Sequence, residues 1–277
     1  MGGSYSVTEG IEEKTFYVDS SDAIDVHVSN EGNISPYYVL DAVEAQAVTD
    51  VDTEHYVINY GDGYNDCPGN TAFYTVAALN GITTVSIYER TGDGLTLRTE
   101  VDLNRFQCFS ERADISGSEP TGDGFVIRSS APVSLYSGNR CAREETDTLY
   151  HSTWSSIPSV SYLGTNYVTY PFTTAFDSPG GSYGVKVVAT QNNTMVSTSL
   201  GQSGTIDQGE STFVWYEYGT GEHVGEVVCS NPCLVLQMVN GTSLEAGVSQ
   251  TIIMPDSRSV ERRCLYVGLN EYTYQVT

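Results

Sequence analysis

The sequence predicts an all-β protein built from tandem duplicated β-sandwich units, with incomplete strand sets at both chain ends. Two observations lead to this prediction. Short runs of β-branched and aromatic residues recur along the 277-residue chain, separated by clusters of Gly, Asn, Asp and Pro. In addition, one long pattern of residues occurs twice.

The strand-like runs are short, and several alternate between apolar and polar residues. They span residues 73–79, 83–88, 95–103, 125–129, 133–136, 185–189, 211–218 and 234–239. Asn80-Gly81 stands between two such runs and predicts a tight hairpin turn. Residues 39–47 form the one helix-like segment, and it is short.

The repeated pattern keeps its register through unlike loops. Tyr56-Val57 aligns with Tyr167-Val168, Val76-Ala77 with Val188-Ala189, and Val85 with Val196, at offsets of 111, 112 and 111 residues, and Pro132 aligns with Pro232 at an offset of 100. An insertion around residues 118–124 accounts for the shorter last offset. The repeat length of about 110 residues is normal for a β-sandwich domain.

The two copies predict three parts of the chain. Residues 1–55 resemble the late strands of a unit, and residues 56–165 form the first complete sandwich. Residues 166–277 form the second sandwich together with a terminal strand, because residues 263–277 resemble the opening of a further unit. The chain is therefore expected to begin late in one unit and to stop early in another.

Charge excludes two classes of partner. The chain has 12 Lys and Arg against 35 Asp and Glu, which gives a net charge of −23. A surface this acidic repels phosphate backbones and anionic lipid, so neither nucleic acid nor a membrane surface is an expected partner. No apolar run approaches the length of a membrane span, and no signal peptide is visible. If the protein is secreted, as we expect, its signal has been removed or replaced.

Six cysteines favour an oxidising compartment: Cys67, Cys108, Cys141, Cys229, Cys233 and Cys264. A zinc site at the Cys-x-x-x-Cys of Cys229 and Cys233 is the alternative, but no other Cys or His pair has matching spacing. Disulfides are therefore predicted. The proposed pairs are Cys67 with Cys108, Cys229 with Cys233, and Cys141 with Cys264.

Three Asn-x-Ser/Thr triplets are candidate N-glycosylation sites, at Asn33, Asn192 and Asn240. Pro36 follows the first triplet and weakens it. Asn192 and Asn240 fall in predicted turns, where a glycan would be exposed. The sequence therefore predicts an extracellular glycoprotein.

Residues 132–142, PVSLYSGNRCA, are followed by LYHSTWSSIPSVSYLGTNYVTYPF at 149–172 and by YGVKVVATQNNTMV at 183–196. Together they resemble the IgGFc-binding protein N-terminal domain family over residues 41–249. That resemblance implies an extracellular, mucus-associated or adhesive module, and it carries no catalytic residues. The chain departs from the family pattern where Leu149-Tyr150-His151 replaces its second Cys, so Cys141 needs another partner, and where residues 155–158 replace its Glu-Gln-x-Pro-Pro block. Binding of immunoglobulin Fc does not follow from the resemblance.

No catalytic residues, cofactor or metal are predicted. His27, His55, His151 and His223 are expected in packing or surface roles, and no nucleophile elbow or phosphate-binding loop is present. Asp62, Asn65 and Asp66 are candidate Ca²⁺ ligands, with Asp50, Asp52 and Glu54 as a second set. Neither loop supplies the terminal bidentate Glu of a calcium loop, so solvated turns are the preferred interpretation.

The 20 tyrosines suit an interface, since each offers contact area with a polar tip, although packing at edge strands explains them as well. Incomplete units at both ends would leave strand edges unpaired, and such edges pair with other chains. We therefore expect a non-catalytic extracellular structural or adhesive protein that self-associates head-to-tail by strand addition into a filament or matrix. The alternative is a monomeric secreted recognition module for a glycoprotein, an immunoglobulin or a glycan.

Overall fold

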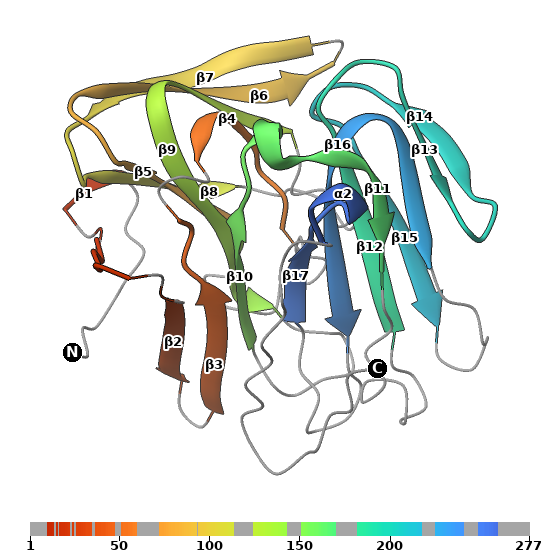
Figure 1. The fold of residues 1–277 in the computed structure, drawn as a ribbon, viewed down its shortest axis with the longest axis horizontal. Helices are drawn as coiled ribbons and strands as arrows, with labels where there is room; N and C mark the ends of the chain where they lie inside the picture. The colour runs from red at the N-terminus through yellow and green to blue at the C-terminus, as the bar shows by residue number, and fades with distance from the viewer. Residues whose placement is uncertain are drawn as a thin grey trace.

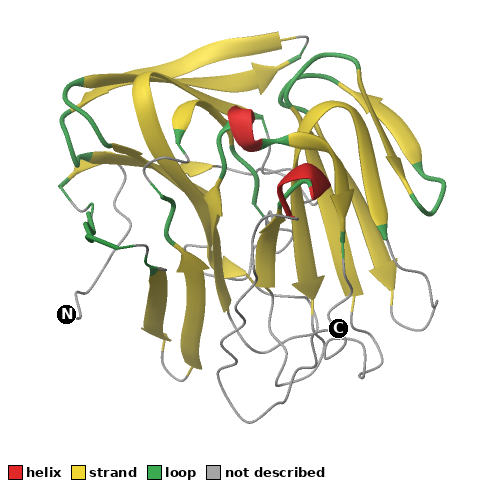
Figure 2. Ribbon diagram, viewed as in Figure 1, coloured by secondary structure: helices red, strands yellow, loops and turns green. Residues whose placement is uncertain are grey.

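Two large antiparallel sheets lie side by side along the long axis of the molecule (Figure 1). The computed structural model describes residues 10–13, 15, 17–22, 24, 26–34, 37–47, 51–59, 72–92, 94–113, 124–142, 151–169, 182–217, 225–240 and 249–259. Strands dominate this part of the chain, and its helices are single short turns, η2 (Val160–Tyr162) and α2 (Asp256–Ser259) (Figure 2). The predicted all-β class with sandwich-like units is confirmed.

The first sheet has eight strands and the second has seven. The first consists of β1 (Gly10–Glu12), β4 (Asp52–Tyr56), β5 (Ala72–Ala78), β6 (Thr83–Thr91), β7 (Gly94–Leu103), β8 (Cys108–Ala113), β9 (Phe125–Ala142) and β10 (His151–Ile157). The second consists of β11 (Gly164–Val168), β12 (Ser182–Ala189), β13 (Thr194–Thr198), β14 (Ser203–Ile206), β15 (Ser211–Glu217), β16 (Glu226–Asn240) and β17 (Ser249–Ile253). A separate hairpin joins β2 (His27–Ile34) to β3 (Tyr37–Glu44).

Both sheets follow one pairing scheme. The first runs β8-β5-β9-β6-β7 and the second runs β15-β12-β16-β13-β14. In the first sheet β4 and β10 also pair with β9, and in the second β11 and β17 also pair with β16. β1, which pairs with β8, has no counterpart in the second sheet among the described strands. Two stretches with the same strand order and the same pairing partners are what a duplication produces.

One long strand organises each unit. Residues 125–129 of β9 pair with β6 and with most of β4, whereas residues 133–142 pair with β5 and β10 and, at Val133, with the first residue of β4. Pro132 lies between the two halves, and Pro232 lies at the same place in β16, because proline cannot donate to a ladder and suits a strand that changes layers. The predicted strands 125–129 and 133–136 are therefore one bent strand.

Hydrogen bonds at this bend fix how the copies align. The N–H of Thr84 donates to Ser130 Oγ, and the N–H of Met195 donates to Ser230 Oγ, both at 2.9 Å. These pairs keep the predicted offsets for Val85 with Val196 and for Pro132 with Pro232.

Two of the predicted alignments are wrong by one residue. Ala78 and Ala189 each exchange backbone hydrogen bonds with the turn before the next paired strand, so Ala189 matches Ala78 and not Ala77. In β4 and β11 the ladder matches Tyr167 with His55 and not Tyr56. The sequence alignment placed identical residues over each other, such as Tyr56 over Tyr167. The backbone pairing shows that the equivalent positions hold different residues.

Two further local predictions are wrong. Residues 39–47 were expected to be helical, but residues 37–44 form β3, where Tyr37, Tyr38 and Val39 pair across the hairpin with β2. An isolated helix of nine residues is marginal, and β-branched and aromatic residues favour a paired strand. Asn80-Gly81 does not close a hairpin, because β5 and β6 do not pair with each other and instead flank β9. The connection crosses over β9.

The apolar core crosses the boundary between the sheets. One buried cluster joins Tyr74, Ile87 and Leu135 of the first sheet to Leu234 and Met238 of the second. A second cluster lies within the second sheet and includes Tyr167, Val187 and Val196. Successive residues of β12 face opposite clusters, with Val188 in the first and Val187 in the second. The two units therefore share buried apolar surface.

Gly138, in the Ser-Gly-Asn of the family-like motif, lies opposite Trp154 in the ladder between β9 and β10. A Cβ there would lie 1.9 Å from Thr153 O and 2.5 Å from Trp154 Cα, so the backbones approach too closely for any side chain. On the other side of β9, Gly138 pairs with Phe73 of β5. In the second unit Met238 is at the position of Gly138, and it pairs with Gly184 at the position of Phe73. Each pair combines one glycine with one large residue. The glycine is on the long strand β9 in the first unit but on β12, the neighbour of the long strand, in the second.

We predict that Gly138→Ala lowers the free energy of unfolding by at least about 1–3 kcal/mol, because the added methyl group forces β9 and β10 apart. Urea unfolding followed by circular dichroism measures the change. Gly204→Ala is the matched control, since a Cβ at Gly204 has no neighbour within 4 Å. Equal stability of the Gly138 and Gly204 variants would show that β10 moves aside without cost.

Candidate binding surfaces

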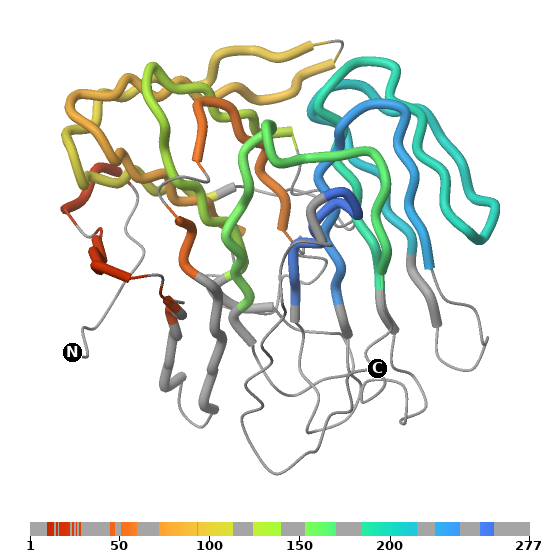
Figure 3. Tube along the Cα trace, in the orientation of Figure 1, coloured from red at the N-terminus to blue at the C-terminus, as the bar shows by residue number. Residues whose placement is uncertain are grey.

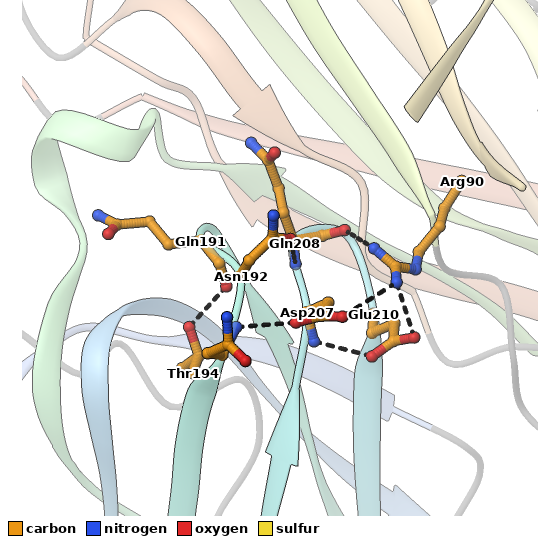
Figure 4. A network of polar contacts seen from close by, with 8 residues as sticks. Arg90, Gln191, Asn192, Thr194, Asp207, Gln208 and Glu210 are labelled. Carbon is orange, nitrogen blue, oxygen red and sulfur yellow. Dashed lines mark hydrogen bonds and ion pairs between the residues drawn. The ribbon is translucent and has the colours of Figure 1, made fainter. Parts of the chain in front are cut away.

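Arg90 joins the two units at their boundary (Figure 4). Its Nη1 donates to Gln208 O at 2.6 Å, and its Nη2 lies 2.9 Å from Glu210 Oε1 and 3.6 Å from Asp207 Oδ2. The side chain of Arg90 is 11% exposed. A buried guanidinium bound to two carboxylates and a carbonyl fixes the turn at residues 207–210 against the first sheet.

The same turn occurs in both units with different side chains. In the second unit the N–H of Asp207 donates to Glu210 Oε2 at 2.8 Å, and in the first the N–H of Asn104 donates to Gln107 Oε1 at 2.9 Å. The third residue of each turn has a left-handed backbone, with φ of 78° at Gly209 and 66° at Phe106. The turn with the two carboxylates, Asp207 and Glu210, faces the guanidinium of Arg90. The acidic side chains therefore occur in the copy of the turn that has a cation opposite it.

The turn of the first unit, which has no carboxylate, faces the N-terminal segment. The ring of Phe106 stacks on Tyr17 with centroids 5.3 Å apart, and Arg105 lies over the same ring at 4.5 Å. The two turns therefore make corresponding contacts. The turn of the second unit contacts the first unit, and the turn of the first unit contacts the segment that precedes it.

Other polar groups cross the boundary between the units. Tyr56 Oη donates to Thr190 O at 2.9 Å and receives a hydrogen bond from Gln208 Nε2 at 2.6 Å. Burial raises the pKa of Tyr56 well above its usual value. Lys186, which is completely buried, donates from Nζ to Asn59 O at 3.2 Å. Because burying polar groups is costly unless they are bonded, these contacts set a single arrangement of the two units.

His55 and Tyr167 occupy equivalent buried positions. His55 Nε2 lies 3.2 Å from Asp52 O, and Tyr167 Oη donates to Gly164 O at 3.0 Å and also to Cys233 O. Each side chain therefore bonds to a carbonyl three residues earlier. Burial lowers the pKa of His55 from its usual value, and burial raises the pKa of Tyr167 to about 12. Both groups are held neutral, which suits packing.

The outer strands of the sheets differ in the features that prevent an edge strand from pairing with another chain. β7 carries Arg98, which pairs with Glu89 and Glu111, and β14 has only four residues. β8 is covered by β1. No described strand covers the outer edge of β15, whose seven residues contain no lysine and no proline. Strand edges without these protective features are able to pair with another chain.

Apolar side chains gather in the N-terminal segment. Five of the nine exposed large apolar residues in the described chain lie here: Ile11, Tyr17, Val18, Ile24 and Val28. Such a concentration within 18 residues is typical of a contact surface.

A family model described as IgGFc binding protein matches residues 42–276, which is most of the chain. The chain belongs to this family. No curated protein and no solved structure gives a significant match. The predicted resemblance over residues 41–249 is thereby confirmed and extended toward the C-terminus.

In this IgGFc-binding family member, one disulfide joins Cys229 to Cys233, as predicted. It spans the bend of β16 at Pro232, where the first unit has Ser129 and Val133. Cys108 is buried, with Sγ 3.6 Å from Glu12 O. Cys67, Cys264 and the side chain of Cys141 lie outside the described residues, so the other two pairings stay predictions.

The remaining predicted sites are placed as follows. Asn192 is exposed in the turn between β12 and β13, and its Oδ1 accepts a hydrogen bond from Gln208 N at 3.1 Å. Asn33 lies within β2 and Asn240 ends β16 rather than lying in a turn. Glycosylation at all three stays a prediction.

The Ca²⁺ candidates Asp62, Asn65 and Asp66 lie outside the described residues. Within the described ranges, no three His, Cys, Asp or Glu residues lie close enough together to hold a metal ion. No helix in those ranges is long and apolar enough to cross a membrane. The Arg90 contacts could not have been found from sequence, because they depend on how two distant turns meet.

We predict that Arg90→Ala lowers the free energy of unfolding by about 1–2 kcal/mol, because the Gln208 carbonyl and two carboxylates lose their donor. Arg128→Ala is the control, since Arg128 is 43% exposed and lies 3.5 Å from Glu54, so its loss should cost less than about 1 kcal/mol. Urea titration of both variants measures the difference. If the two variants were equally stable, Arg90 would not be fixing the boundary.

We also predict a loss of stability in alkali. Burial raises the pKa values of Tyr56, Tyr74, Tyr136 and Tyr167 above the unfolded value of 10. Their contribution is complete below pH 10 and is lost as the pH rises through the folded pKa values, by up to about 1.4 kcal/mol per pH unit for each tyrosine. For Tyr167 the decline falls between pH 10 and about 12.

Urea unfolding at several pH values from 8 to 11.5 tests this prediction. Tyr167→Phe should show a shallower decline above pH 10 than the wild type, because the variant has one tyrosine fewer to ionise. Identical slopes would contradict the assigned role of Tyr167.

Proposed function

We propose that this protein is a non-catalytic extracellular structural or adhesive protein that self-associates head-to-tail by strand addition into a filament or matrix. The observation that carries this proposal is the outer edge of β15, which no described strand covers, whereas β1 covers the equivalent edge of β8 in the first unit. Backbone N–H and C=O groups on such an edge form hydrogen bonds with any strand of suitable register.

Several features support a role outside the cell. The Cys229–Cys233 disulfide requires an oxidising compartment to persist, and membership of the IgGFc-binding family fits a secreted protein. The acidic surface keeps single molecules apart in solution. The contacts across the unit boundary join the two units into one body, which suits a repeating building block.

A monomeric recognition module is the second candidate. The family description names immunoglobulin Fc, and family membership is the observation that favours binding of a separate glycoprotein. The exposed apolar residues of the N-terminal segment would then form the surface for that partner. Self-association distinguishes the two candidates, because a recognition module stays monomeric.

We predict that the unreduced protein forms regular fibres in negative-stain electron microscopy, with concentration-dependent mass in light scattering. Because each molecule carries a net charge of −23, assembly should increase with salt. Raising the ionic strength from 0.01 M to 0.1 M shortens the screening length from about 30 Å to about 10 Å.

Particles that stay at the monomer mass of 30.1 kDa at all protein and salt concentrations would overturn the filament proposal. Binding to immobilised Fc, with a non-immunoglobulin glycoprotein as the control, would then test the recognition module. Disordered aggregates without an axial repeat would also count against the filament.

A further inference from the structure

We propose that a second copy of this chain docks by repeating the boundary between the two units. In this contact the turn at residues 104–107 of one copy lies against Val168 and Glu226 in the second unit of another copy. This inference rests on the proposed self-association and adds a contact between side chains to it. Comparison of each unit with its duplicate defines the two surfaces.

The boundary inside one chain shows what a turn of this kind binds. The turn at residues 207–210 of the second unit lies against Tyr56 and Val126 of the first unit. Gln208 Nε2 donates to Tyr56 Oη at 2.6 Å, and a Cβ at Gly209 would lie 3.8 Å from Val126 Cγ2. Tyr56 and Val126 are cross-strand partners in the ladder between β4 and β9. The turn therefore packs against the last pair of this ladder.

Val168 and Glu226 form the equivalent pair in the second unit. They are cross-strand partners at the end of the ladder between β11 and β16, in the same register as Tyr56 and Val126. Tyr56 and Val126 are buried at the boundary, whereas Val168 is 38% exposed and Glu226 is also exposed. The Val168–Glu226 pair therefore presents to solvent the surface that the first unit has covered.

The turn at residues 104–107 is the equivalent of the turn that docks inside the chain. It follows β7 on the side of the first unit away from the second, beside the N-terminal segment (Figure 3). Its second residue, Arg105, is exposed, and its third residue, Phe106, is half-buried. In a repeated boundary these two residues would lie against the Val168–Glu226 pair of the other copy.

The charges of the two surfaces are complementary. Arg105 lies over the ring of Phe106, and the backbone N–H of Glu226 donates to Ser199 Oγ at 3.4 Å. Within the described chain, neither the Arg105 guanidinium nor the Glu226 carboxylate has an oppositely charged partner. Because Arg105 would lie beside Val168, the cross-strand partner of Glu226, the two charged groups come within reach of each other.

Both surfaces also lack the charges that join the units inside the chain. The turn of the first unit has amides in place of the two carboxylates that bind Arg90. The hairpin of the second unit that matches the Arg90 hairpin, residues 194–206, contains no Lys or Arg. The cation is absent from one surface and the carboxylates from the other, as expected for surfaces that meet. Arg105 and Glu226 supply a charge pair of the opposite polarity.

The lengths of the hairpins fit the sizes of the turn residues. A Cβ at Gly209 would lie 3.4 Å from Leu95 Cδ2, so the boundary inside the chain admits only a small residue at this position. β6 beside that boundary has nine residues, whereas β13 beside the Val168–Glu226 pair has five. The shorter hairpin would give the ring of Phe106 the space that Gly209 lacks.

The contact joins different surfaces on two copies and is therefore heterologous. Each added molecule presents a fresh Val168–Glu226 pair, so the contact repeats into an open chain of molecules or a closed ring. The exposed Tyr17 and Val18 lie beside the turn, where Tyr17 stacks on Phe106, and would enlarge the contact. A contact of this kind gives association that depends on protein concentration.

Two full-length variants test the inference. Arg105→Glu and Glu226→Arg each place like charges at the contact. We expect each to lower the association constant about tenfold or more, corresponding to 1.4 kcal/mol or more. Light scattering and sedimentation velocity measure the loss. Glu100→Arg, at an exposed position of β7, changes the net charge as Glu226→Arg does and should assemble like the wild type.

The decisive measurement exchanges the charges. The double variant Arg105→Glu/Glu226→Arg keeps the net charge of −23 and again has opposite charges at the contact. We expect it to associate about tenfold or more tightly than either single variant. An equimolar mixture of the single variants should recover as well, because the new carboxylate of one meets the new guanidinium of the other and their unchanged residues form the wild-type pair. Arg105→Gln replaces Arg105→Glu if circular dichroism shows the latter to be unfolded.

The outcomes separate this inference from the proposed function. If the wild type assembles and both single variants assemble equally well, this contact is overturned and self-association stands. Weakened single variants without recovery in the double variant and in the mixture would also overturn it, because Arg105 and Glu226 would then act separately. A wild type that stays monomeric and binds immobilised Fc through Arg105 would assign the turn to a separate glycoprotein, and both the proposed self-association and this contact would fail.

Discussion

The structure depends on one constraint, the need of each long strand to satisfy its backbone hydrogen bonds in two layers. β9 and β16 each change most of their partners at a proline, so one strand belongs to both faces of its unit. The serine hydroxyl two residues before each proline accepts a backbone N–H at the bend. Because four strands pair with each long strand, the curvature of the whole unit follows from this single bend.

The boundary between units shows how two similar domains become one body. Apolar residues of both sheets share a core, and buried polar groups there are bonded across the boundary. The apolar contacts supply most of the attraction, while Arg90 and Tyr56 determine which arrangement is reached. The duplicated turn has amide side chains at its first and last positions in residues 104–107 and carboxylates in residues 207–210, where Arg90 lies opposite.

Much of the architecture could be predicted from sequence, because strand alternation and a long repeat are local patterns. The proposed Cys229–Cys233 pair is confirmed, although the six cysteines allow many pairings and only the short spacing of these two favoured it. The β3 segment was missed because its helix-like spacing was outweighed by pairing with β2, a contact between separate segments. Asn80-Gly81 looked like a hairpin, since nothing local shows that β9, more than 40 residues later, separates β5 from β6. The contacts of Arg90 depend on the same kind of distant meeting.

The glycine exchange between the units has a consequence for how the duplication has diverged. Phe73 lies opposite Gly138, and Gly184 lies opposite Met238, so the large residue is on β5 in the first unit and on β16 in the second. A chimera that transplanted only β16 into the place of β9 would set Phe73 against Met238 and would put a side chain where the β10 backbone lies against Gly138, and the reverse exchange would set Gly138 opposite Gly184. The central strands are therefore inherited as matched pairs, and recombination between the repeats can succeed only where it moves both partners together.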